Sequence, residues 1–290
     1  MIYDWIISPF ADYSFMRRAL VACFALSLGA APIGVFMMLR RMALIGDAMT
    51  HAILPGAALA FLFAGASVWP MTLGGLIAGL LVALGAGCIS RFTTLKEDSS
   101  FMGMYLISLS AGVMIISVNG SAIDLLHVLF GNILAVDNAS LILIASIATI
   151  SVVTLAVIYR PLIIECFDPA FLRSQNGKGA WYHQLFLVLI VLNLVAAFQA
   201  IGTLMALGII LLPAIAARFW VQSVDTIIPL SIGFACLASM SGLLLSYHFS
   251  LPSGPSVVLV AGALYMLSVL LGTRESVRLR FFPHKHFATT

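Results

Sequence analysis

The sequence predicts an all-α protein that crosses a membrane several times as a transmembrane helical bundle of about nine helices, with eight as the alternative count. Of its 290 residues, 62% are hydrophobic and only 9% are charged, whereas about 25% of the residues of a soluble domain are charged. The charges are also clustered, and they leave apolar stretches close to the roughly 20 residues that a helix needs to cross the hydrocarbon layer. Helices are expected because a backbone in lipid must satisfy its own hydrogen bonds. The apolar stretches lie at about 19–39, 49–68, 71–90, 101–119, 140–159, 182–200, 202–221, 226–247 and 256–273.

These stretches define one membrane domain with a segment at each end. Residues 19–273 are predicted to form a single transmembrane domain. Residues 1–18 contain aromatic and acidic side chains but lack the residue order of a cleaved signal peptide, so we expect them to lie in the membrane interface. Residues 274–290 are predicted to be a basic cytoplasmic tail. Eight helices are the alternative because a glycine and a proline interrupt the stretch 182–221, which could therefore be divided differently.

Basic residues predict the orientation of the helices. Cytoplasmic loops carry an excess of Lys and Arg, and the loops after the first, third, fifth, seventh and ninth stretches fall on one face under strict alternation. We assign that face to the cytoplasm, and Arg17 and Arg18 on the outer side are the exception. A net charge of +3 distributed in this way predicts no nucleic-acid partner. The inner basic residues are Arg40, Arg41, Arg91, Lys96, Arg160, Arg173, Lys178, Arg218, Arg274, Arg278, Arg280 and Lys285.

The stretch RRMALIGDAMTHAILPGAALAF, residues 40–61, contains the strongest candidate for a metal site. Asp47 and His51 are four residues apart, which places them on one face of a helix with Cβ atoms about 6 Å apart. A charged group at bilayer depth costs about 2.5–3.5 kcal/mol on insertion scales, so such groups are paired, bound to metal or facing water. A carboxylate with an imidazole suits Mn, Fe or Zn. The alternative is that Asp47 caps the start of the helix and that His51 is merely interfacial. His183 and His248, at the ends of predicted helices, are interpreted as ordinary interfacial side chains.

The polar stretch RPLIIECFDPAFLRSQNGKG, residues 160–179, predicts a short helix on the inner face. Asp168 followed by Pro169 suits a helix N-cap with proline at the first helical position, so a helix is expected over about 169–175. It is either a simple connection or a docking element for a partner. The chain has no nucleotide-binding loop of the GxxxxGK type, so ATP-driven transport would need an ATPase on another chain. Neither HExxH nor GxSxG occurs, which argues against an intramembrane enzyme.

Three stretches resemble the metal-ion ABC permease family, the membrane subunits of bacterial zinc, manganese and iron importers. They are residues 40–61, FDPAF at 167–171 and LLLSYHFSLPSGPSVVLVAG at 243–262. The similarity covers nearly the whole chain, and its GDAxxHAxLPG core is more specific than an isolated Asp–His pair. The resemblance implies a type II ABC importer-like permease, multi-pass insertion in the bacterial cytoplasmic membrane, and transport rather than enzyme activity.

The same resemblance implies the site residues and the partners. Asp47 and His51 match the family's metal-coordinating residues, and the segment 161–178 contains its cytoplasmic coupling helix, which sits in a groove of the ATPase. The implied partners are a second copy of the chain, two ATPase subunits and an external metal-binding protein. No permanently bound cofactor is expected, and the cargo is Zn²⁺ or Mn²⁺, with Fe²⁺ a further candidate. The residues that match the coupling helix are Phe167, Asp168 and Pro169.

Ligand number predicts a homodimer. One chain offers two good metal ligands, whereas Zn or Mn in a protein usually takes about four or more, some of them water. Two copies would supply two Asp47–His51 pairs to a shared path. A gradient-driven secondary metal transporter is the alternative function, but it would predict several carboxylates within the membrane, and only Asp47 is convincingly placed in a span.

Overall fold

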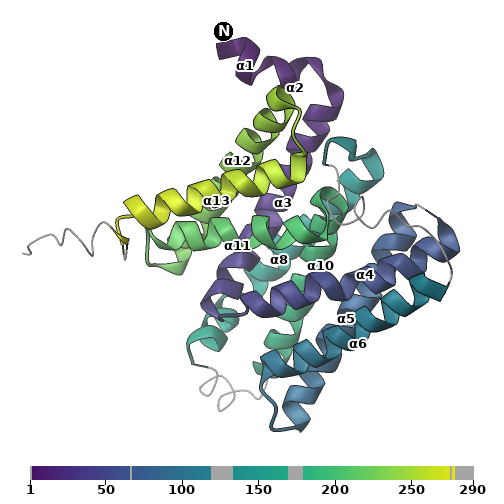
Figure 1. The fold of residues 1–290 in the computed structure, drawn as a ribbon. Coiled ribbons are helices and arrows are strands. Elements are labelled where there is room, and N and C mark those ends of the chain that lie inside the picture. The colour runs from purple at the N-terminus through teal and green to yellow at the C-terminus, as the bar shows by residue number, and fades with distance from the viewer. Residues whose placement is uncertain (1, 66, 119–132, 169–178, 275, 278–290) are drawn as a thin grey trace, which may run out of the picture.

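The computed structural model describes residues 2–65, 67–118, 133–168, 179–274 and 276–277. Within these ranges every regular element is a helix (Figure 1), as the composition predicts. The elements are α1 (Ile2–Ile6), α2 (Ser8–Asp12), α3 (Ser14–Leu39), α4 (Ala43–Ala64), α5 (Val68–Phe92), α6 (Glu97–Val118), the 3₁₀ turn η1 (Ile133–Ala135), α8 (Asn138–Phe167), α10 (Gly179–Ile201), α11 (Thr203–Arg218), α12 (Val224–Phe249) and α13 (Ser253–Leu271).

Seven of the helices in the described residues are long and apolar enough to cross a membrane, namely α3, α4, α5, α8, α10, α12 and α13. The predicted count of nine is slightly off, although each of the nine apolar stretches lies mainly within a helix. The helix α6 has 22 residues and opens with the polar sequence EDSS before an apolar run. The helix α11 has 16 residues, fewer than the roughly 20 that span the hydrocarbon layer.

Two helix boundaries differ from those expected. The helix α3 begins at Ser14, so Arg17 and Arg18 belong to its first turns instead of preceding it. The helix α8 continues through Pro161 to Phe167, beyond the predicted end of that stretch near residue 159. A proline is tolerated in a membrane helix because neighbouring groups satisfy the freed carbonyl.

The helices α3, α10 and α11 form the centre of the bundle. The helix α3 packs against α8, α11 and α12, while α10 packs against α5, α8 and α11. Between α3 and α10, the fully buried rings of Phe36 and Phe186 meet edge to face with centroids 6.2 Å apart. The helices α12 and α13 pair on one side of this centre, and α4, α5 and α6 form a group on the other side (Figure 1).

The backbones of α4 and α5 approach each other closely at a pair of glycines. A Cβ built on Gly56 would lie 2.0 Å from the carbonyl oxygen of Gly74, and one built on Gly74 would lie 2.2 Å from that of Gly56. Small residues allow membrane helices to pack at such short range. Because Gly56 is nine residues from Asp47, at about 100° per residue it faces the opposite side of α4. The glycine contact therefore turns the side of α4 that carries Asp47 away from α5.

Candidate metal-translocation site

Asp47 and His51 lie on α4, directly after a tight turn from α3. The chain reverses at Arg41, whose φ of 58° is the left-handed conformation. The helix α4 begins at Ala43, with Met42 in the N-cap position. Asp47 therefore lies inside the helix, more than one turn beyond its start, and does not occupy the cap position that the alternative interpretation required.

Asp47 and His51 are on the side of α4 that the described residues cover least. Asp47 is exposed and His51 is half-buried. Met49 is fully buried in the core, and the buried Thr50 donates its hydroxyl back to the Asp47 carbonyl oxygen at 2.7 Å. Neither side chain therefore lies on the exposed side of α4 beside Asp47. An uncovered carboxylate within a membrane helix must meet water, a cation or another chain, because lipid would not solvate it.

Tyr105 of α6 lies beside the His51 imidazole. The two ring centroids are 6.0 Å apart and the ring planes are tilted by 37°. Three residues further along α6, the Ser108 hydroxyl donates to the Ala52 carbonyl oxygen at 3.4 Å. These contacts fix α6 against the turn of α4 that holds His51, so Tyr105 limits the space in which the imidazole can rotate.

One chain supplies an incomplete ligand set. Among the residues that the structure describes, no group of three or more His, Cys, Asp or Glu side chains could hold a metal ion. A carboxylate and an imidazole can bind a divalent cation, but the remaining coordination positions must be filled by water or by a second chain.

Comparison with known proteins places the chain in a family. The ABC 3 transport family matches residues 12–272, nearly the whole chain. The chain belongs to the ABC 3 transport family.

Relatives within the ABC 3 transport family match over almost their full length. The manganese import system permease protein ScaB of Streptococcus gordonii is 31% identical over 264 residues, which cover 91% of this chain and 94% of ScaB. A probable iron transport system membrane protein of Haemophilus influenzae is 30% identical over 272 residues, which cover 92% of this chain and 97% of that protein. A chain of PsaBC from Streptococcus pneumoniae, solved in complex with Fab, is 30% identical with a TM-score of 0.83 and covers 97% of this chain and 100% of its own length.

Membership of the ABC 3 transport family confirms the resemblance to metal-ion ABC permeases. Together with seven apolar helices of spanning length among the described residues, it makes the protein a multi-pass permease of the bacterial cytoplasmic membrane. The chain is a transporter subunit and not an enzyme.

Two of the three predicted coupling residues of this ABC 3 permease lie at the C-terminal end of α8. Phe167 is the last residue of α8, and 67% of its side chain is exposed. Asp168 is the C-cap of α8, and its backbone N–H donates to the Ile164 carbonyl oxygen at 2.8 Å. Pro169 and the short helix expected over 169–175 lie outside the described residues. An aromatic side chain is thus accessible where the chain leaves α8.

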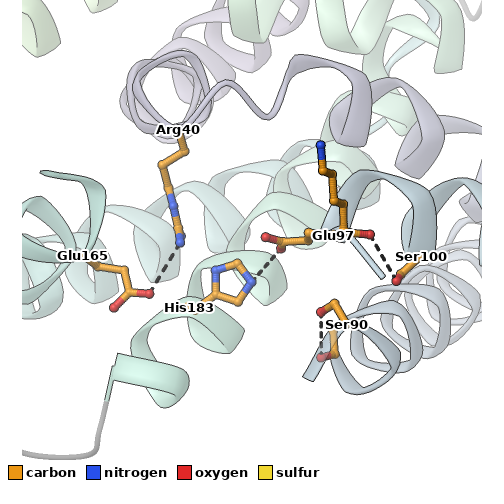
Figure 2. A network of polar contacts seen from close by, with 8 residues as sticks. Arg40, Ser90, Glu97, Ser100, Glu165 and His183 are labelled. Carbon is orange, nitrogen blue, oxygen red and sulfur yellow. Dashed lines mark hydrogen bonds and ion pairs between the residues drawn. The ribbon is translucent and has the colours of Figure 1, made fainter. Parts of the chain in front are cut away.

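The structure also brings together titratable side chains whose contacts the sequence did not predict (Figure 2). Arg40, at the end of α3, has its Nη2 3.6 Å from Oε1 of the buried Glu165 on α8. His183, near the start of α10, has its Nε2 2.7 Å from Oε1 of Glu97, the first residue of α6. The interfacial interpretation of His183 misses this contact. His248, in contrast, stacks on the exposed Trp5 at the other end of the bundle, with ring centroids 4.4 Å apart.

Asp137 caps α8 at the opposite end from Glu165. Its carboxylate accepts a hydrogen bond from the Ser140 backbone N–H at 2.8 Å. This bond favours the ionised carboxylate and holds the pKa of Asp137 below its usual value.

Proposed function

We propose that this chain is the membrane conduit of an ATP-driven importer of Mn²⁺, in which each of two copies contributes Asp47 and His51 as metal ligands. The observation that carries the proposal is the placement of this pair on the uncovered side of α4, one turn apart, in a chain whose relatives include a manganese import permease. Zn²⁺ and Fe²⁺ are the competing cargoes, and the iron transport relative is the reason to test Fe²⁺.

Ligand chemistry favours Mn²⁺ as the cargo. Two Asp–His pairs form a set that Zn²⁺ would hold as a closed tetrahedron, whereas Mn²⁺ would bind more weakly and add water ligands. Weak binding suits a conduit because the ion must leave as well as enter. Cu⁺ prefers thiolate and thioether ligands, and Met49, which lies between Asp47 and His51 in the sequence, is buried on another side of α4.

The proposed partners are two ATPase subunits on the inner face and an external metal-binding protein on the outer face. The exposed Phe167 ring supports an ATPase contact at the end of α8, since an aromatic side chain there can enter an apolar groove of a partner. Phe167, Asp168 and Pro169 are the proposed coupling residues.

Uptake of ⁵⁴Mn by cells lacking other importers tests the metal pair. Asp47→Asn and His51→Gln should abolish uptake, while Asp98→Asn, which changes an exposed carboxylate at the start of α6, should leave it unchanged. All variants should co-purify with the ATPase, so that loss of uptake is not loss of assembly. Competition by Zn²⁺ and Fe²⁺ then identifies the cargo, and uptake at the wild-type rate by both pair variants would exclude the site.

Co-purification of the ATPase tests the docking contact. Phe167→Ala should reduce the ATPase recovered with the permease, whereas Phe249→Ala should not, because Phe249 is a similarly exposed ring at the outer end of α12. Equal recovery with both variants would exclude Phe167 as a coupling residue.

A further inference from the structure

The Arg40–Glu165 ion pair and the Glu97–His183 contact connect four different helices. Arg40 and Glu165 join the end of α3 to the last turns of α8, and Glu97 and His183 join the start of α6 to the start of α10 (Figure 2). Three of these residues are shielded from solvent: the side chains of Arg40, Glu165 and His183 are 12%, 6% and 11% exposed. Charged groups are rarely placed in such surroundings unless they are paired.

The Arg40–Glu165 pair is incompletely bonded in this conformation. Its 3.6 Å separation exceeds the roughly 2.7–2.9 Å of a charge-assisted hydrogen bond. Arg40 Nη1 and Glu165 Oε2 are both buried without a hydrogen-bond partner in the described residues. The Arg40 guanidinium meanwhile rests over the Phe186 ring, 5.6 Å from its centroid. Burial of unsatisfied charged atoms is unfavourable, so the pair would gain from a second arrangement of the helix ends in which both hydrogen bonds form.

Each contact has one residue near the end of α8 or the start of α10. Glu165 lies two residues before Phe167, in the last turn of α8, and His183 lies four residues after the start of α10 at Gly179. Phe167, in the proposed ATPase contact, lies on the same last turn of α8 as Glu165. Because α8 packs against α10, a displacement of Phe167 would act on Glu165 directly and on His183 through α10.

The other residue of each contact is connected to α4, the helix that carries Asp47 and His51. Arg40 is the residue before the turn into α4, which carries Asp47 and His51. Glu97 opens α6, which packs against α4 and α5 and places Tyr105 beside the His51 ring. A movement of either partner would thus be passed to α4, directly through its first turn or laterally through α6.

We propose that the Arg40–Glu165 ion pair and the Glu97–His183 contact transmit movement of the end of α8 and the start of α10 to α4, and so couple ATP hydrolysis by the partner subunit to metal release. This inference rests on the proposed function, because it takes the metal pair and the ATPase contact as its two ends. The four residues are positioning residues, since none of them is proposed to touch the ion.

The test is the ratio of ⁵⁴Mn transported to ATP hydrolysed by the assembled transporter in proteoliposomes. Glu165→Gln and His183→Gln should retain ATP hydrolysis but lower the transport ratio by about 5- to 150-fold, the usual range of a coupling between sites. Exchange of the charges in Arg40→Glu with Glu165→Arg should restore part of the ratio. Tyr159→Phe is the matched control on α8, because it removes a hydrogen bond to Asp225 that is not next to the connection; its ratio should equal that of the wild type.

Wild-type ratios in both Glu165→Gln and His183→Gln would overturn the inference. If a single variant does not assemble, the doubly neutral Arg40→Met with Glu165→Gln variant removes both charges together, and a wild-type ratio there would also overturn it. Failure of the proposed function is separate: Asp47→Asn would then transport normally, whatever the ion-pair variants do.

Discussion

Substitution of Gly56 by alanine should separate α4 from α5 and disturb the metal face of α4. The new Cβ would lie 2.0 Å from the Gly74 carbonyl oxygen, and Cβ atoms essentially never approach a neighbour within 3.0 Å, so the two backbones must part by about 1 Å. Neither partner is a flexible side chain that could move aside. Overpacking of a well-packed contact costs about 1–3 kcal/mol, and we expect Gly56→Ala near the upper end of that range.

Thermal unfolding in detergent and ⁵⁴Mn uptake measure the two consequences. Gly56→Ala should unfold at a lower temperature than the wild type and transport more slowly, because α4 carries both the glycine contact and the proposed metal pair. Gly233→Ala is the matched control: its Cβ would meet no atom within 4 Å, and alanine is favoured over glycine in a helix by about 1 kcal/mol. Equal unfolding temperatures and uptake rates for Gly56→Ala and the wild type would refute the close contact.

Three further predictions concern α8 and α6. Asp137→Ala should lower the free energy of unfolding by about 0.5–2 kcal/mol through loss of the α8 cap. Because the Ser140 N–H lowers the pKa of Asp137, the contribution of the cap should be fully present at neutral pH and disappear as pH falls below about 4. Melting curves of the wild type and the variant at pH 7 and pH 3 would measure this difference. Ser151→Ala should cost only about 0.5–1.5 kcal/mol in chemical denaturation, because the Asn193 amide loses its 2.6 Å bond to the Ser151 hydroxyl but keeps the 2.9 Å bond to the Leu189 carbonyl oxygen. Tyr105→Ala should slow ⁵⁴Mn uptake while Tyr105→Phe should not, since Tyr105 meets His51 ring to ring; equal rates for both variants would remove Tyr105 from the site.

Features set by local periodicity could be predicted from the sequence. The i, i+4 spacing of Asp47 and His51 places them on one side of any helix, and the structure has them inside α4 on its uncovered side. The division of the stretch 182–221 at Gly202 was also correct, because Gly202 adopts a φ of 80° between α10 and α11. The number of spans was less secure, because an apolar stretch can form a helix as short as the 16 residues of α11.

Features set by packing between distant helices could not be predicted. Nothing near Arg40 in the sequence indicates Glu165 as its partner, and the contact exists only because α3 packs against α8. His183 lies at a helix end, where an imidazole is ordinarily solvated, and nothing near it in the sequence indicates its contact with Glu97 at the start of α6. The Gly56–Gly74 contact likewise depends on how α4 and α5 cross.

The position of the bound ion tests the central claim most directly. Anomalous scattering from Mn²⁺ in crystals of the assembled transporter would locate the ion without reference to activity. We expect a peak on the uncovered side of α4, within ligand distance of Asp47 and His51 from two copies of the chain. A peak elsewhere in the protein, with none within ligand distance of Asp47 and His51, would contradict this assignment.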